Sequence, residues 1–293
     1  MSDDVRWPRA SAWLASGRGS DLAVLGVPTH LTSISPTGAD ATPAAIRAAL
    51  ARYSTYAATH GVDISTVGVS DLGDVAQPDE DEASVIDRAG AAAGASRLLV
   101  ALGGDNSLTY GVARGVWGEH IGSSGLVTLD AHHDLRDGIS NGSPVRRLIE
   151  AGLAGTRVVQ VGIADFSNSP EYAARARDLG ITVITRGALR TRPIADAMIE
   201  AISIAASAGG PVHVDLDVDV CDRSVVPGCP AAAPGGLSAD ELRQAAFLAG
   251  RSLAVRSMDI AEIDATADAA DGRTVRLGAL LVLEAACGVA RRT

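Results

Sequence analysis

The sequence "GLVTLDAHHDLR" (residues 125–136) places a mostly apolar run directly before a dense group of polar side chains. Continuous runs such as "GLVTL" are typical of strands that are buried on both faces. Asp130, His132 and Asp134 follow at intervals of two residues, so in extended backbone their side chains lie on one face. We therefore expect these three side chains to converge where a buried strand ends.

Two further segments repeat this arrangement. The segment "VHVDLDVD" (residues 212–219) carries Asp215, Asp217 and Asp219 at the same spacing. The segment "LLVALGGDNS" (residues 98–107) ends in two glycines, Asp105 and Asn106. The glycines indicate a tight turn with close backbone approach, although Gly-Gly-Asp-Asn alone also fits a plain turn.

Strand-like and helix-like segments alternate along the chain. Short apolar runs begin at residues 21, 64, 97, 125, 157, 181, 212 and 253, and Ala-rich segments with helical spacing lie between them. The run "ISTVGV" (residues 64–69) is expected to be one of the strands. This pattern predicts a mostly parallel sheet, either open with helices on both faces or closed into a (β/α)8 barrel. In both architectures ligands bind beyond the carboxyl ends of the strands.

The acidic residues at these strand ends point to a metal site. Any one of them could be a solvated loop residue or part of a salt bridge. Five or six carboxylates and an imidazole together would repel one another strongly, because burying unpaired charge costs several kcal/mol per ion. Carboxylate oxygens with one imidazole and no thiolate favour Mn²⁺, with iron and zinc as alternatives. A pair of such ions about 3.5–4 Å apart could activate water.

Composition excludes several other classes of protein. The net charge is −10 and the longest basic run is Arg-Arg, so nucleic acid is not an expected partner. Every one of the 25 basic residues is arginine, which excludes Schiff-base and P-loop lysine chemistry. The three cysteines form no Cys-x-x-Cys. With no apolar run near the roughly 18 residues needed to span a bilayer, we expect a cytoplasmic protein without a membrane partner.

The motifs together resemble the ureohydrolase family of arginases, agmatinases and formimidoylglutamases. The resemblance rests on "GGDNS", "DAHHD", "VDLDVDVCD", "PGCPAAAPGGLS" and the closing "DIAEIDATAD", in that order. It extends over nearly the whole chain and implies one domain spanning residues 1–293. The implied fold is a three-layer α/β/α sandwich with an open, mostly parallel sheet and two manganese ions at the strand ends.

The resemblance also implies roles for individual residues. Asp130 and Asp215 would bridge the two metals, and Glu262 would bind the amidine or guanidinium group of the substrate. Asp134 would accept a hydrogen bond from the metal-bound hydroxide that attacks the substrate. The full set of implied metal ligands is Asn106, Asp130, His132, Asp134, Asp215 and Asp217.

Two residues depart from the pattern that most of the family shows. Asn106 stands where most members have a histidine ligand, and a neutral amide oxygen is a weaker ligand for a transition metal. One manganese is therefore expected to be weakly held. Asn141 stands where many members have a proton-shuttling histidine, and an amide cannot exchange protons near neutral pH. Asn141 remains a candidate for catalysis and for substrate binding.

These departures resemble the formimidoylglutamase branch more than the arginases or agmatinases. The implied reaction is hydrolysis of N-formimidoyl-L-glutamate to formamide and L-glutamate, in histidine degradation. Because this small-molecule substrate carries two carboxylates, we expect arginines to bind them bidentately. Arg136, Arg146 and Arg223 are the candidates, although a surface salt bridge is the commoner role for any single arginine.

Two other functions stay open at this point. One is a guanidino hydrolase, such as an agmatinase, an arginase or a hydroxyarginine hydrolase. The other is a ureohydrolase-like binding protein that has lost catalysis, because the two family histidines are replaced. The resemblance further implies a homo-oligomer, either a trimer or a hexamer.

Overall fold

The core of the molecule is one parallel sheet. In this computed structural model, which describes residue 4 and residues 6–292, eight strands pair in the order β4-β1-β5-β10-β9-β6-β7-β8, and all their pairings are parallel. The strands are β1 (Leu22–Val27), β4 (Val69–Asp74), β5 (Leu98–Gly103), β6 (Gly125–Leu129), β7 (Val158–Ile163), β8 (Thr182–Thr185), β9 (Val212–Asp217) and β10 (Val255–Ala261). A small antiparallel pair, β2 (Tyr56–Ala57) and β3 (Val62–Asp63), lies apart from this sheet.

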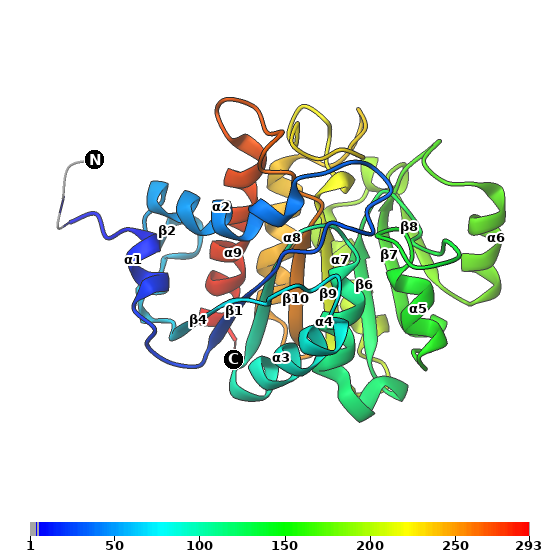
Figure 1. The fold of residues 1–293 in the computed structure, drawn as a ribbon, viewed down its shortest axis with the longest axis horizontal. Helices are drawn as coiled ribbons and strands as arrows, with labels where there is room; N and C mark the ends of the chain where they lie inside the picture. Colours follow the sequence, from blue (N-terminus) through cyan, green and yellow to red (C-terminus); the bar gives the residue numbers. More distant parts are fainter. Residues whose placement is uncertain (1–3, 5, 293) are drawn as a thin grey trace.

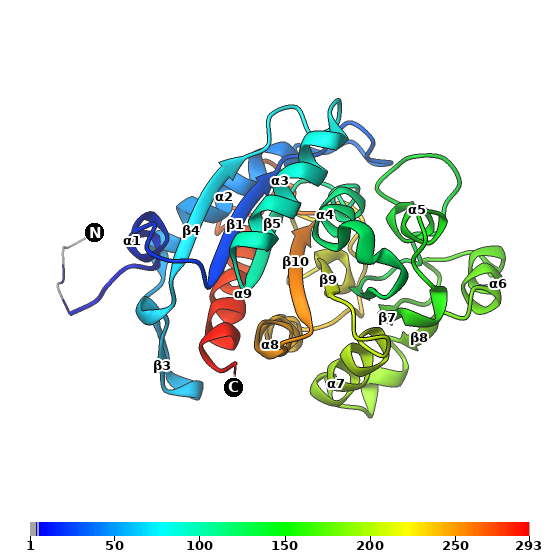
Figure 2. The same ribbon diagram turned by 90° about the horizontal axis from the view of Figure 1, so that it is seen from below.

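Helices cover both faces of the sheet (Figure 2). The helices α3 (Glu82–Ala95), α4 (Leu108–Trp117) and α5 (Pro144–Glu150) pack on one face, and α7 (Ile194–Ala205), α8 (Ala239–Arg251) and α9 (Arg273–Ala290) pack on the other. Three more helices complete the set in the described residues: α1 (Ala10–Ala15) beside β4, α2 (Thr42–Ala49) against α9, and α6 (Pro170–Asp178) beside β8. The result is a three-layer sandwich.

The expected open sandwich is confirmed, and the barrel alternative is wrong. The strands β4 and β8 form opposite edges of the sheet. Every residue of the inner strands β1, β5, β6, β7 and β9 is buried. Burial on both faces explains why these strands read as continuous apolar runs rather than as alternating patterns.

The expected strand at residues 64–69 is misplaced. Ile64–Thr66 form a 3-10 turn. Asp63 caps it, because its carboxylate accepts a hydrogen bond from the Ser65 amide. The strand β4 begins only at Val69 and runs through polar, mostly exposed residues. An edge strand faces water and needs no continuous apolar run. The apolar residues that suggested a strand therefore lie mainly in the turn before it.

The topology gathers the candidate residues at one edge. The strands β5, β10, β9 and β6 are consecutive neighbours in the sheet, and their carboxyl ends point the same way (Figure 1). Asn106 follows β5, Asp130 follows β6, Asp217 ends β9 and Glu262 follows β10. Among the described residues, no helix is long and apolar enough to cross a membrane.

Candidate metal centre and substrate cavity

The loop after β6 and the end of β9 meet around His132. Its Nδ1 lies 2.7 Å from Oδ2 of Asp219 and 3.5 Å from Oδ1 of Asp130. The Asp130 carboxylate also accepts a 2.6 Å hydrogen bond from the His132 amide, and Asp219 accepts one from the Ala131 amide. Donor atoms of Asp130, His132 and Asp219 lie within 4.8 Å of one another, as a metal site requires.

Asp215 and Asp217 bring two more carboxylates to the same place. Both are buried at the end of β9. Neither oxygen of Asp215 has a hydrogen-bond partner within residues 6–292, and the same holds for Oδ2 of Asp130. Burial, reinforced by the neighbouring carboxylates, raises the pKa of Asp215 and Asp217 well above the ordinary range, and burial together with Asp219 raises the pKa of Asp130 to about 7.

These carboxylates fit a divalent metal. Buried carboxylate oxygens without partners cost free energy unless a cation neutralises them. Oxygen ligands with a single imidazole are the donor set that suits Mn²⁺. Asp130, Asp215, Asp217 and His132 therefore form a suitable cradle.

Asn106 lies at the cradle in an orientation that the sequence did not predict. Its Nδ2 donates a 2.7 Å hydrogen bond to Oδ2 of Asp134, and its Oδ1 accepts a 2.7 Å hydrogen bond from the Thr109 hydroxyl. The amide nitrogen rather than the oxygen thus faces the acidic group. To coordinate a metal through its oxygen, the Asn106 amide would have to turn over and release both bonds.

Glu262 is held at the same edge by two donors. Its Oε1 accepts hydrogen bonds from Nδ2 of Asn141 (2.9 Å) and from the backbone amide of Asn106 (2.8 Å). Burial raises the pKa of Glu262 to about 7, against the opposing effect of these donors. Glu262 and Asp134 both have left-handed backbone, with φ of 64° and 52°. Such conformations cost of the order of 1–3 kcal/mol each and cluster at functional sites.

A glycine makes this arrangement of loops possible. A Cβ on Gly104 would lie 1.8 Å from the carbonyl oxygen of Thr29, so the expected close backbone approach is confirmed. The Gly104 carbonyl in turn accepts a 2.9 Å hydrogen bond from the Glu262 amide. This contact ties the end of β5 to the end of β10.

The site opens into a cavity of about 380 Å³. Its wall includes His132 and the acidic residues Asp134, Asp217, Asp219 and Glu262. The loops contribute Arg136, Asn141, Asn168, Ser169 and Tyr172. Gly142 lets the Arg136 stem lie against its backbone, since a Cβ there would come within 2.8 Å of the Arg136 Cδ. Among the residues that line this cavity, four are acidic and Arg136 is the one arginine.

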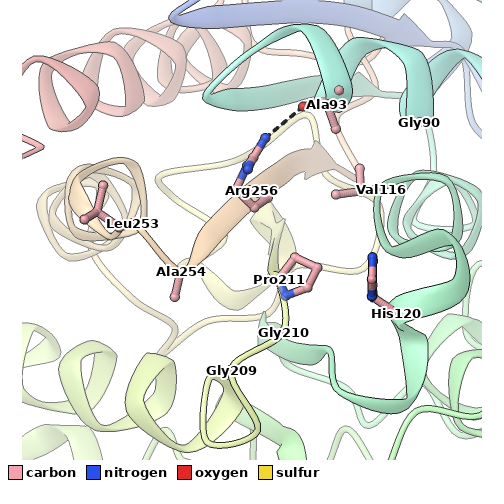
Figure 3. A pocket seen from close by; sticks show the side chains of 11 residues that line it. Gly90, Ala93, Val116, His120, Gly209, Gly210, Pro211, Leu253, Ala254 and Arg256 are labelled. Atoms are coloured by element: carbon pink, nitrogen blue, oxygen red, sulfur yellow. Dashed lines mark hydrogen bonds between the residues drawn. The ribbon is translucent and has the colours of Figure 1, made fainter.

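A second cavity of about 450 Å³ lies at the amino ends of the strands (Figure 3). It is lined by Arg256, His120 and the Gly209–Pro211 turn among others. Arg256 donates there to the carbonyl oxygens of Ala93 and Ser96. None of the acidic strand-end residues lines this cavity. In a parallel sheet, catalysis is expected at the opposite edge.

Two of the three arginines expected to bind substrate carboxylates are placed elsewhere. Arg146 donates to Glu150 and to the carbonyl oxygens of Arg136 and Gly138, so it braces the loop that carries Arg136. Arg223 donates to the Cys229 carbonyl. Neither residue is among those that line the cavity. Both arginines are close to the motifs in the sequence, yet their guanidinium groups lie outside the site.

Several residues around the site were not singled out from the sequence. Gln160, in the middle of β7, holds the His133 ring at 2.6 Å through its Oε1 and binds the His133 carbonyl through its Nε2. Asn168 bridges the His133 amide and the Ala131 carbonyl. Gln160 could have been found in the sequence as a polar residue within an apolar strand. Asn168 lies in a polar loop, and nothing else in the sequence marks it.

Asp219 and Asp222 both follow β9 closely in the sequence, but only Asp219 reaches the site. Asp219 is buried and contacts His132 directly. Asp222 instead accepts hydrogen bonds from Ser224 and Gly235 within the following loop. His213, which shares the Asp215 face of β9, bonds to Ser257 and Asp259 below the cavity.

Comparison with known proteins decides the family. A model of the arginase family matches residues 20–288. The chain belongs to the arginase family. It is 34% identical over 264 residues to a formimidoylglutamase of Halalkalibacterium halodurans, covering 84% of this chain and 81% of that protein.

Solved structures agree with this assignment. The formimidoylglutamase of Bacillus subtilis superimposes with a TM-score of 0.90 at 31% identity, over 98% of this chain and 94% of that one. A formiminoglutamase of Trypanosoma cruzi, solved with Mn²⁺, gives a TM-score of 0.89 at 25% identity, over 98% of this chain and all of that one. The predicted ureohydrolase resemblance and its arginase-like fold are confirmed, and the chain is a metal-dependent hydrolase of this family.

Proposed function

We propose that this chain hydrolyses N-formimidoyl-L-glutamate to formamide and L-glutamate with two bound Mn²⁺ ions. The observation that carries the proposal is the polarity of the cavity. Glu262 and Asp134 lie at its acidic wall, and Arg136 lies on the loop side. A cationic amidine at one end and carboxylates at the other match this distribution of charge.

The ligands of the metals would be Asp130, His132, Asp134, Asp215 and Asp217. Asp130 and Asp215, the most deeply buried of the set, are proposed to bridge. When bound, the two ions would supply a water molecule that is deprotonated near neutral pH. Asn106 provides a neutral amide in place of a stronger ligand, so one of the two ions is proposed to be held more weakly.

The residues of the chain would position the substrate and move its protons. Glu262 accepts hydrogen bonds from the amidine N–H groups and stabilises their positive charge. Asp134 accepts a hydrogen bond from the attacking hydroxide, then takes its remaining O–H proton after the attack and passes that proton to the leaving nitrogen of glutamate. The C–N bond breaks as that nitrogen is protonated, and formamide is left on the other side.

Asn141 would act by position. Its amide donates to Glu262 and accepts a 3.0 Å hydrogen bond from the Ile34 amide, so it connects the loop after β1 to the catalytic acid. No proton shuttle passes through it in this proposal. Its second role would be to contact the substrate, since it lines the cavity.

Arg136 would bind the substrate carboxylates. It is the one of the three candidate arginines that lines the cavity, and a guanidinium binds a carboxylate with two parallel hydrogen bonds. A guanidino substrate without carboxylates, such as agmatine, would gain nothing from this contact. This favours formimidoylglutamate over agmatine, whereas arginine and hydroxyarginine, which carry one carboxylate, have to be separated from it by assay.

A substrate panel tests the proposal. The Mn²⁺-loaded protein is assayed with N-formimidoyl-L-glutamate, arginine and agmatine, and formamide and urea are measured separately. Formamide release from the first substrate at a kcat/KM at least 100-fold above the others is expected. Faster urea release would indicate a guanidino hydrolase, and no turnover despite bound metal would indicate a binding protein.

The remaining proposals concern context. We propose that the reaction belongs to histidine degradation, that the protein acts in the cytoplasm, and that it forms a homo-oligomer. The first of these depends on the activity for which the relatives are named, formimidoylglutamase. Size-exclusion chromatography with light scattering distinguishes a trimer or hexamer from a monomer.

A further inference from the structure

A layer of buried polar side chains lies beneath the candidate metal site. On β9, His213 and Asp215 are paired with Ser257 and Asp259 of β10 in parallel register, so the four side chains form a two-by-two grid on one face of the sheet. All four are fully buried. The ring centroids of His213 and of Trp117 in α4 lie 6.4 Å apart in a T-shaped arrangement, so that helix packs beside the grid.

The grid is connected by short hydrogen bonds that run toward the metal site. His213 Nδ1 lies 2.7 Å from the Ser257 hydroxyl, and Nε2 lies 2.9 Å from Oδ2 of Asp259. The hydroxyl can donate to Nδ1, which leaves the proton on Nε2 to be donated to Asp259. His213 therefore fixes one oxygen of Asp259 from below.

The other oxygen of Asp259, Oδ1, is not the one that contacts His213. Oδ1 of Asp259 and both oxygens of Asp215 have no hydrogen-bond partner within the described chain. Asp259 and Asp215 are register partners on β10 and β9. Two carboxylates placed side by side in the interior are unfavourable by themselves, yet the fold keeps them there.

We propose that the His213–Asp259 pair is a positioning device that orients Asp215 and increases the affinity of the site for divalent cations. Asp259 touches neither substrate nor metal in this account, and its negative charge acts through Asp215. Groups that orient metal ligands commonly change metal affinity about 10–100-fold when they are altered. The inference rests on the metal site proposed above.

The decisive variant is Asp259→Asn. Its carbonyl oxygen can still accept from His213, while its amide nitrogen can donate to an unpaired oxygen of Asp215. The neutral amide removes the charge behind Asp215, so the Kd for Mn²⁺ should rise by about 10–100-fold. The metal-free protein should melt at the same or a higher temperature, because a repulsive buried contact is replaced by a hydrogen bond. A merely structural role would lower the melting temperature instead.

The experiment measures Mn²⁺ binding to the full chain by the electron paramagnetic resonance signal of free Mn²⁺, with thermal melts of the metal-free protein in parallel. Ser124→Ala is the matched control, because it removes a buried hydroxyl that donates to the His120 carbonyl and takes no part in the grid. Its Mn²⁺ affinity should stay within about 3-fold of wild type. His213→Gln keeps a donor for Asp259 and should also stay within that range, whereas His213→Leu should weaken binding about tenfold or more.

Each outcome decides the question. A tenfold or larger loss of affinity in Asp259→Asn without a lower melting temperature supports the proposal. A smaller loss, or a loss that comes with destabilisation, overturns it. If Asp259→Asn does not fold, equal affinities of His213→Gln and His213→Leu overturn the proposal, and unequal ones support it. If the wild-type protein itself binds no Mn²⁺, the proposed function fails first, and that result is distinct from all of these.

Discussion

Asn141 donates a hydrogen bond to Glu262, with Nδ2 of the amide 2.9 Å from Oε1 of the acid. The two residues are 121 positions apart in the chain. The backbone amide of Asn106 donates to the same oxygen, so both donors bind one oxygen of the carboxylate. This arrangement supports the role proposed for Glu262 in binding positive charge.

Glu262→Gln should separate that role from stability. The variant keeps an oxygen for both donors but loses the negative charge that the amidine requires, so kcat should fall by about 10²–10³-fold. Its melting temperature without metal should not fall, because a buried carboxylate is replaced by a neutral group. Glu241→Gln, in the exposed capping box of α8, is the control and should keep full activity. Wild-type kcat in Glu262→Gln would remove Glu262 from the mechanism.

Arg136→Ala should affect substrate binding more than turnover. Loss of a bidentate carboxylate contact is expected to raise KM for N-formimidoyl-L-glutamate by about 10–100-fold with a smaller change in kcat. Steady-state kinetics check this. Arg177→Ala is the matched control, since that side chain is 75% exposed and forms an ion pair with its neighbour Asp178. Equal KM values for the two variants would place the substrate carboxylates elsewhere.

Asn106→His should strengthen the weaker metal site. An imidazole is a better ligand for Mn²⁺ than an amide, so the metal retained after dialysis should rise toward two ions per chain. Elemental analysis measures this directly. Asn106→Ala, which offers no ligand, should retain no more metal than the wild type. Unchanged retention in Asn106→His would show that this position lies outside the coordination sphere.

Metal-free protein should lose stability as the pH rises from 5 to 7. Burial raises the pKa of Asp130 and Glu262 to about 7 each, so the folded protein keeps protons that the unfolded chain releases near pH 4. Where the folded state binds more protons, the free energy of unfolding falls with rising pH. Each carboxyl contributes a loss of the order of 3 kcal/mol across this window.

Bound Mn²⁺ should reverse the part of this trend that comes from Asp130, because the ion replaces the protons on the ligand carboxylates. Urea unfolding at pH 5 and pH 7.5, with and without Mn²⁺, gives the four free energies. The stabilisation by Mn²⁺ should be larger at pH 7.5. A metal-free protein that is more stable at pH 7.5 than at pH 5 would contradict the raised pKa of Asp130 and Glu262.

Patterns of two-residue spacing predicted the acidic cluster well, because strand geometry fixes which side chains share a face. The convergence of Asp130, His132 and Asp217 at one edge follows from parallel pairing, which brings the ends of β6 and β9 together, although Asp130 and His132 lie in the loop after β6, where strand alternation does not apply. The same rule could not show that Asp219, one turn beyond β9, would contact His132. That contact depends on the 3-10 turn Val218–Val220, which no periodicity reveals.

Long side chains were the least predictable part of the site. Arg146 and Arg223 lie near the motifs in sequence, yet each turns to backbone carbonyls of its own loop. An arginine can reach several partners within one loop, and sequence does not rank them. Buried polar residues within apolar strands, such as Gln160 and Asp259, were visible in the sequence, but their partners depend on strand order.

The central claim is that Asp130 and Asp215, from separate strands, together hold two divalent ions. Crystals soaked with Mn²⁺ and a substrate analogue, measured for anomalous scattering near the manganese edge, test it most directly. We predict two anomalous peaks about 3.5–4 Å apart, both within bonding distance of Asp130 and Asp215. No peak beside these carboxylates at saturating Mn²⁺ would contradict the account.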